Sequence, residues 1–216
     1  MWSYYGSKSK IINKYPEPIY DTLIEPFAGT ARYAYKYWQK NVVLYDLFPD
    51  IINIWKYLQN AKPEDILSLP NVAYKEDIRK YTQLSETERL LIGYCINRGS
   101  ATRRNIAQKF NDWDKDKIRI ANDLYKIKHW KIVLGSYNEI ENNDATWFID
   151  PPYQYGGDRY KFNNKNIDYA KLSEWCRERK GQVIVCENSK SDWMDFKPLI
   201  SLHGQRHETT EVIWCR

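Results

Sequence analysis

Residues 147–153 have the sequence Trp147-Phe148-Ile149-Asp150-Pro151-Pro152-Tyr153, an apolar run followed at once by a carboxylate, two prolines and an aromatic ring. An apolar run bounded by turn residues predicts a buried strand. The tetrapeptide 150–153 would then lie at the carboxyl end of that strand, where open α/β sheets bind their ligands. An ordinary turn is the alternative, because Asp and Pro favour turns by themselves.

The residue types of this tetrapeptide suit chemistry at an exocyclic amine of a nucleobase. Such an amine is a poor nucleophile because its lone pair is delocalised into the ring. An enzyme that uses it must therefore accept hydrogen bonds from its N–H groups. The Asp150 carboxylate and a backbone carbonyl can accept them, and paired prolines hold that carbonyl in a rigid loop. The ring of Tyr153 can then stack on the base.

Two earlier segments also consist of an apolar predicted strand that ends at residues able to bind a ligand. Residues 22–30 end in the small-residue turn Pro26-Phe27-Ala28-Gly29-Thr30, and helix-compatible residues follow at 31–38. Small residues there let a ligand approach the backbone closely. Residues 42–46 end in Asp46, and an acidic residue after the second strand commonly binds the ribose of an adenosine cofactor. Asp46 as a cap of the next helix is the alternative.

In this order the segments resemble the motifs of the Dam-like (D12 class) DNA adenine-N6 methyltransferases. That family has aromatic-x-Gly-Gly-Lys, Phe-x-Gly-x-Gly, an Asp after the second strand, and Asp-Pro-Pro-Tyr. The corresponding residues are Tyr4-Tyr5-Gly6-Ser7-Lys8, Phe27-Ala28-Gly29-Thr30-Ala31, Asp46 and 150–153. The likeness covers nearly the whole chain, including 183–188 and 211–214. It implies an α/β, three-layer Rossmann-like methyltransferase fold with a small helical target-recognition insertion.

The resemblance also implies a reaction, which is site-specific transfer of a methyl group from S-adenosylmethionine to the N6 amine of adenine in DNA. No covalent enzyme intermediate and no metal are expected. The catalytic residues would be Asp150, Pro151, Pro152 and Tyr153. The cofactor-binding residues would be Tyr4, Gly6, Lys8, Glu25, Pro26, Phe27, Ala28, Gly29, Thr30, Asp46 and Asp150.

The chain departs from the family pattern at two glycine positions. Ser7 and Ala31 each replace the second glycine of a motif, so both turns lose backbone freedom. Weakened cofactor binding would leave a catalytically impaired DNA-binding protein on the same fold. A methyltransferase that acts on RNA or another planar amine is the other alternative. Ser136 stands where relatives often have an acidic residue, and we assign it no role.

The length of 216 residues suits one domain with a small insertion. We predict a catalytic domain over 1–60 and 132–216, with helices at 49–60 and 168–180 and strands at 182–186 and 207–216. Asp168 would cap the later helix, and Gly181 would stop it. The stretch 61–131 has no convincing strand and a helical pattern at 86–97. It is therefore predicted to be the helical target-recognition insertion.

Basic residues are concentrated within this chain of net charge +5. From 98 to 131, ten Lys and Arg face four Asp, a local balance of +6. That concentration is typical of phosphate contact, although a solvated helical face is the alternative for 115–119. In the loop 97–105 we expect Arg98, Arg103 and Arg104 to contact DNA. A second loop, 154–166, which includes Tyr160, is expected to close over an extruded adenine; a disordered surface loop is the alternative.

The remaining features predict a cytoplasmic protein, and the family resemblance implies a bacterial or phage-infected cell. The four cysteines form no close pair and have no His at zinc-ligand spacing, which predicts reduced thiols and no metal site. No apolar run is long enough to span a membrane. We expect a monomer with DNA as its partner.

Overall fold

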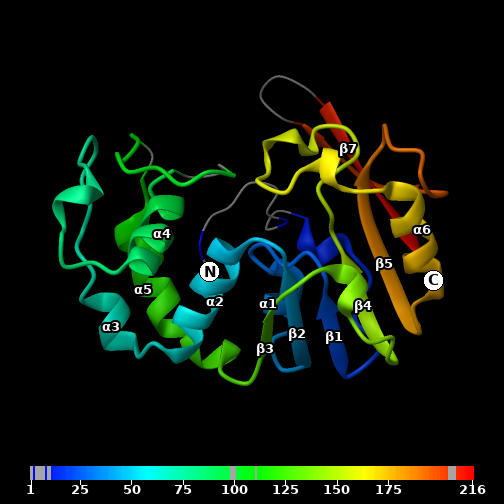
Figure 1. Ribbon diagram of the computed structural model, residues 1–216, viewed down its shortest axis with the longest axis horizontal. Coiled ribbons are helices and arrows are strands. Elements are labelled where there is room, and N and C mark those ends of the chain that lie inside the picture. The colour runs from blue at the N-terminus through cyan, green and yellow to red at the C-terminus, as the bar shows by residue number, and fades with distance from the viewer. Residues whose placement is uncertain (1, 3–7, 9–10, 98–100, 110, 204–207) are drawn as a thin grey trace.

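The described strands form one seven-stranded sheet with the order β3-β2-β1-β4-β5-β7-β6 (Figure 1). This computed structural model describes residues 2, 8, 11–97, 101–109, 111–203 and 208–216. The strands are β1 Thr22–Glu25, β2 Asn41–Asp46, β3 Lys131–Leu134, β4 Ala145–Ile149, β5 Gly181–Asn188, β6 Lys197–His203 and β7 Glu208–Cys215. β1 to β5 pair in parallel, and β7 runs antiparallel to both β5 and β6. The predicted α/β fold class is confirmed.

Each face of the sheet has its own apolar core, because successive strand residues point to opposite sides. Leu23 and Phe148 pack on the face that also buries Trp55. Ile24 and Trp147 pack on the other face. Helices cover both faces, so the molecule has three layers, with the sheet in the middle (Figure 1).

The described helices are α1 Arg32–Lys36, α2 Pro49–Asn60, α3 Pro63–Leu67, α4 Glu86–Cys95, α5 Trp113–Asp123 and α6 Tyr169–Glu178. The predicted helix at 49–60 is confirmed as α2, while α4 ends two residues earlier than predicted. Asp168 caps α6, accepting a hydrogen bond from the Lys171 N–H at 3.2 Å. The prediction that Gly181 stops this helix is wrong. Arg179 is already extended, and Gly181 is the first residue of β5.

The stretch from 61 to 130 contains α3, α4, α5 and short 3-10 turns, and its described residues form no strand beyond one bridge between Asp77 and Ile106. Its apolar side chains, such as Leu91 and Trp113, belong to the same core as Trp55 of α2. The helical region therefore extends the core of one face of the sheet. Its role in target recognition stays a prediction.

Candidate active site

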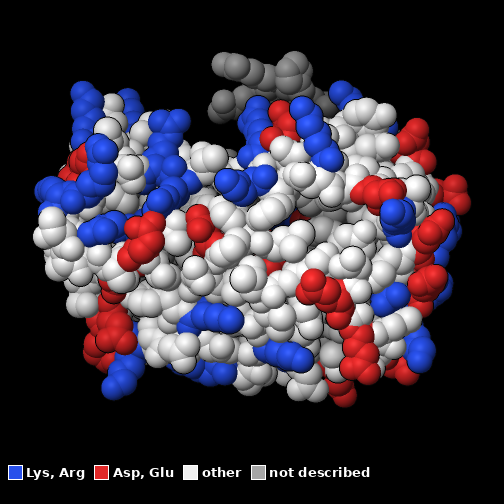
Figure 2. Space-filling model, viewed as in Figure 1, with Lys and Arg blue, Asp and Glu red and all other residues white. Residues whose placement is uncertain are grey.

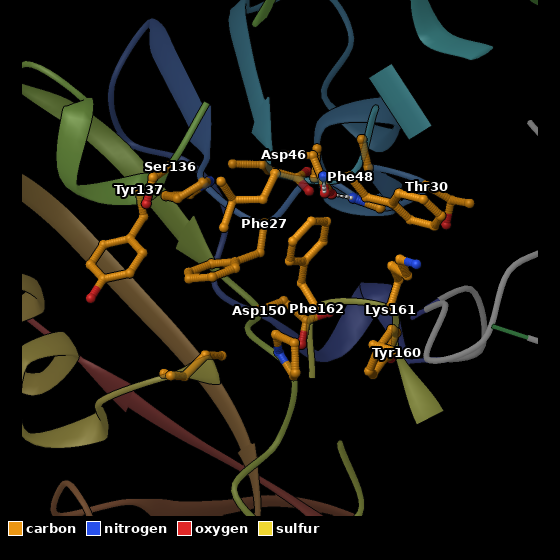
Figure 3. A pocket seen from close by; sticks show the side chains of 18 of the residues that line it. Phe27, Thr30, Asp46, Phe48, Ser136, Tyr137, Asp150, Tyr160, Lys161 and Phe162 are labelled. Carbon is orange, nitrogen blue, oxygen red and sulfur yellow. Dashed lines mark hydrogen bonds between the residues drawn. The ribbon is translucent and has the colours of Figure 1, made fainter. Parts of the chain in front are cut away.

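Four loops meet at one edge of the sheet because β3, β2, β1 and β4 are neighbours and run in parallel. These loops follow Glu25, Asp46, Leu134 and Ile149 at the carboxyl ends of their strands. They enclose a cavity of about 310 Å³ (Figure 3). The position agrees with the general rule that open parallel sheets bind ligands beyond their carboxyl edge.

The turn after β1 has a left-handed backbone at two places. Gly29 has a φ of +45°, and Ala31 has a φ of +43°. The Gly29 N–H donates to Asp46 Oδ2 at 2.9 Å, and Trp55 Nε1 donates to the Gly29 carbonyl at 2.8 Å. Ala31 takes up a conformation that costs a non-glycine residue about 1–2 kcal/mol. The substitution at position 31 has therefore not removed the left-handed turn.

Asp46 braces this turn with both of its carboxylate oxygens. Oδ2 accepts from Gly29, and Oδ1 accepts from the Phe48 N–H at 2.8 Å (Figure 3). Burial raises the pKa of Asp46 to about 6, although the two N–H donors act in the opposite direction. Each carboxylate oxygen can accept more than one hydrogen bond, so Asp46 is still able to accept from ribose hydroxyls.

Aromatic rings line the cavity on both sides of Asp46. The rings of Phe27 and Tyr137 lie 5.5 Å apart, and those of Phe48 and Phe162 lie 6.2 Å apart. Figure 3 shows Phe162 extending from the loop after β4 toward Asp46 and Phe48. An acceptor for ribose, aromatic walls for a base and a left-handed turn that lets a ligand approach the backbone fit an adenosine-containing cofactor.

Asp150 lies at the end of β4 and is paired with Lys8. Lys8 Nζ donates to Asp150 Oδ1 at 2.8 Å, and the two side chains are 8% and 22% exposed. Burial raises the pKa of Asp150, and the neighbouring ammonium opposes this shift. A buried carboxylate next to one cation can accept a further hydrogen bond inside the cavity.

Hydrogen bonds hold two other residues of the tetrapeptide, Tyr153 and Pro152. The Tyr153 hydroxyl accepts from Lys8 Nζ at 2.6 Å and donates to Glu211 of β7. Tyr169 of α6 donates to the Pro152 carbonyl at 2.6 Å. Among the described residues, Asp150 and Pro152 line the cavity, whereas Pro151 and Tyr153 do not. In this structure the Tyr153 ring is packed against the core rather than turned into the cavity.

Glu25 forms a buried part of the cavity wall. Its Oε1 accepts from the Ala34 N–H of α1 at 2.6 Å, and only 2% of the residue is exposed. Burial raises the pKa of Glu25 to about 8, against the effect of the Ala34 donor. Burial therefore disfavours a negative charge on this carboxyl group.

The structure brings together most of the residues singled out in the sequence. The predicted cofactor residues within the described part of the chain all line the cavity, namely Lys8, Glu25, Pro26, Phe27, Ala28, Gly29, Thr30, Asp46 and Asp150. Tyr4 and Gly6 lie outside the described residues. Phe48, Ser136 and Tyr137 also line the cavity, although no role was assigned to them from the sequence. The signal available for them was their position directly after β2 and β3.

The predicted DNA-contacting residues fall in two places. Tyr160 lines the cavity together with Lys161, while Arg103 and Arg104 are exposed beyond α4. Arg103 forms an ion pair with Glu86 at 2.5 Å. Figure 2 shows Lys and Arg side chains gathered along the upper rim, over the helical region and over the loop after β4. Arg98 lies outside the described residues.

Within the described residues, no group of three or more His, Cys, Asp or Glu side chains is arranged to hold a metal ion. None of the described helices has the length and apolar character needed to cross a membrane.

Comparison with known proteins gives one family. Residues 4–142, more than half of the chain, match the D12 class N6 adenine-specific DNA methyltransferases. This match ends before Asp150, so the tetrapeptide is evidence separate from it. No curated protein matches the chain.

Two solved structures are similar at low identity. One is a candidate methylase from Haemophilus influenzae, with a TM-score of 0.37, 10% identity and coverage of 89% of this chain and 85% of that chain. The other is an rRNA methyltransferase from Streptomyces viridochromogenes, with a TM-score of 0.40, 10% identity and coverage of 91% and 79%.

Proposed function

This chain belongs to the D12 class N6 adenine-specific DNA methyltransferase family, and on that premise we propose that it methylates the N6 amine of adenine at a specific site in DNA. The methyl donor is S-adenosylmethionine. One observation carries the proposal: Asp46 and Asp150 open into the same cavity from the ends of β2 and β4. A cofactor held at Asp46 and an amine held at Asp150 would therefore share one enclosed space.

The residues around the cofactor would act by binding and orientation. S-adenosylmethionine supplies an electrophilic methyl group on a sulfonium. Asp46 would accept hydrogen bonds from the ribose, and Phe27 and Phe48 would contact the apolar parts of the ligand. Holding two reactants in one geometry removes much of the entropic barrier to a reaction between them.

The residues around the amine would raise its nucleophilicity. Asp150 would accept a hydrogen bond from one N6 hydrogen, and the carbonyl of Pro151 would accept a hydrogen bond from the other. The nitrogen lone pair would then be directed at the methyl group. The hydrogen bond from Tyr169 to the Pro152 carbonyl keeps this turn in place. We assign the residues 150–153 as the catalytic tetrapeptide.

An adenine inside a duplex cannot reach this cavity, so it must leave the base stack. We propose that the loop 154–166 covers it, and this is supported by Tyr160 and Phe162 of this loop, which line the cavity. Arg98, Arg103 and Arg104 are proposed to hold the phosphates on the helical side. DNA is the proposed partner.

The experiment is transfer of labelled methyl from S-adenosylmethionine to unmethylated duplex DNA, followed by nucleoside analysis. Asp150→Asn is expected to lower kcat at least about a hundredfold, because the amide is a weaker acceptor than the carboxylate in a site where one hydrogen bond is worth that much. Cofactor binding measured by calorimetry should persist.

Asp144→Asn is the matched control, since Asp144 is exposed just before the start of β4, at the opposite edge of the sheet. If the wild-type protein transferred label to RNA or another amine and none was recovered as N6-methyladenine, the proposed substrate would be refuted. Full activity in Asp150→Asn would refute the assigned site.

A further inference from the structure

Glu211 is a buried carboxylate that does not line the cavity but is bonded to the catalytic tetrapeptide. It lies on β7, and 6% of the residue is exposed. Its Oε1 accepts from the Tyr15 hydroxyl at 2.6 Å and from the Tyr153 hydroxyl. The residue faces Asn188 across the antiparallel pairing of β5 and β7. The closing hairpin of the sheet therefore reaches the end of β4.

Two carboxylates in this cluster share one ammonium group. Lys8 Nζ lies 2.8 Å from Asp150 Oδ1 and 3.6 Å from Glu211 Oε1, and it also lies 4.6 Å from the centre of the Tyr153 ring. Burial disfavours the ammonium, yet Asp150 and Glu211 together outweigh this and raise the pKa of Lys8. A buried carboxylate is costly unless it is paired and hydrogen-bonded, so the position of Glu211 is unusual for a strand residue.

The shared ammonium matters for the proposed reaction. Asp150 has to accept a hydrogen from the target amine, and a strong ion pair with Lys8 competes for the same carboxylate. Glu211 also attracts Lys8, and its carboxylate accepts the hydrogen bond of the Tyr153 hydroxyl. Removal of its charge would leave Lys8 to Asp150 alone and weaken the hydrogen bond that holds the Tyr153 hydroxyl.

We propose that Glu211 is a positioning residue for the catalytic tetrapeptide, which holds Tyr153 by its hydroxyl and shares Lys8 with Asp150. The inference rests on the proposed function, because the step that it supports is hydrogen-bond acceptance by Asp150. It assigns a role in the reaction to β7, a strand outside the cavity.

Glu211→Gln tests the charge while preserving the shape and the acceptor oxygen. The expected result is a kcat at least about tenfold lower, since a displaced catalytic group can cost up to about a hundredfold. The Kd for S-adenosylmethionine and the unfolding midpoint should remain close to those of the wild type. Glu174→Gln, on the exposed side of α6, is the matched control. A wild-type kcat in Glu211→Gln would overturn the proposal.

Tyr153→Phe is the second variant, which decides the question if Glu211→Gln does not fold. It keeps the ring and removes only the hydroxyl that bonds to Lys8 and Glu211. A lowered kcat with unchanged cofactor binding is expected. Wild-type turnover by this variant would overturn the proposal, because the link from Glu211 to the tetrapeptide would then be unnecessary.

The proposed function fails separately if the wild-type protein transfers no methyl group to DNA. Crystal structures of the wild type and of Glu211→Gln then test the positioning role without turnover. Displacement of the Tyr153 hydroxyl and of Lys8 Nζ in the variant is expected. Unchanged positions of both groups would overturn the inference.

Discussion

The buried carboxyl groups around the catalytic tetrapeptide differ in their partners. Asp150 is paired with an ammonium, whereas Glu25 accepts from a backbone N–H, and burial raises the pKa of both groups. Glu187 at the end of β5 is fully buried and accepts from the N–H groups of Gln154 and Asn188. Glu187 thus ties the loop 154–166 to the sheet at its first residue.

Glu187 should make the protein less stable as the pH rises. Burial raises its pKa from an ordinary 4.5 to about 7, in spite of the backbone donors. The folded state therefore binds a proton that the unfolded state has lost, and stability falls between about pH 4.5 and pH 7. Glu187→Gln removes this titration, so its stability relative to the wild type should improve by up to about 3 kcal/mol between pH 5 and pH 8. Denaturant unfolding at both pH values measures this change.

Glu174→Gln is the matched control for this prediction, because Glu174 is exposed. Its stability relative to the wild type should be the same at both pH values. Parallel pH profiles for the wild type and Glu187→Gln would contradict the assignment of a raised pKa to Glu187.

At the scale of elements, the start of β5 depends on a glycine. Gly181 has a φ of +87°, and a Cβ placed there would lie 2.3 Å from the Ala145 carbonyl oxygen of β4. The close approach is required because Ala145 and Gly181 are paired in the parallel register of β4 and β5. Only glycine combines that backbone conformation with that contact.

Gly181→Ala is therefore expected to destabilise the protein by more than about 3 kcal/mol, since left-handed strain and a backbone clash add. Gly156→Ala is the matched control: Gly156 has a φ of +93° but nothing within 4 Å of its Cβ position. It should cost only the strain, about 1–2 kcal/mol. Thermal unfolding compares the two variants, and equal losses would show that the contact with Ala145 does not matter.

At the scale of the whole molecule, the basic residues counted between 98 and 131 do not form one patch, which corrects the expectation from the sequence. Lys117 is buried and donates to the Leu69 carbonyl at 2.7 Å. Lys128 donates to the carbonyls of Gln59 and Ala61 at the end of α2. Such residues serve the helical core, so the local charge of the sequence overstates the charge presented to DNA.

Because some of these basic residues serve the core, we expect DNA binding to depend on particular exposed arginines. Arg103→Ala with Arg104→Ala should weaken duplex binding and reduce the slope of log K against log salt by about 2, since each phosphate contact contributes about 0.9. Lys56→Ala with Lys131→Ala removes the same charge from other exposed positions, and Lys131 lies at the start of β3. Fluorescence anisotropy over a range of salt concentrations measures both. Equal effects of the two pairs would contradict a contact specific to Arg103 and Arg104.

Local sequence patterns were enough to predict several helices and strands of this protein. Apolar runs that end at Glu25, Asp46 and Ile149 predict strands, and all three end where expected. The helix at 49–60 was also predictable, because periodic apolar residues and an initial proline act over short distances. The positions of Asp46 and Asp150 at strand ends follow from the same local signals.

Which side chains lie together around the tetrapeptide depends on the packing of the whole chain. Tyr15 and Glu211, 196 residues apart, meet because β7 inserts between β5 and β6 and runs antiparallel to both. The same strand order turns the hydroxyl of Tyr153 toward β7 and brings Lys8 between two carboxylates. Local patterns carry no information about such contacts, because strand order and burial depend on how the whole chain packs.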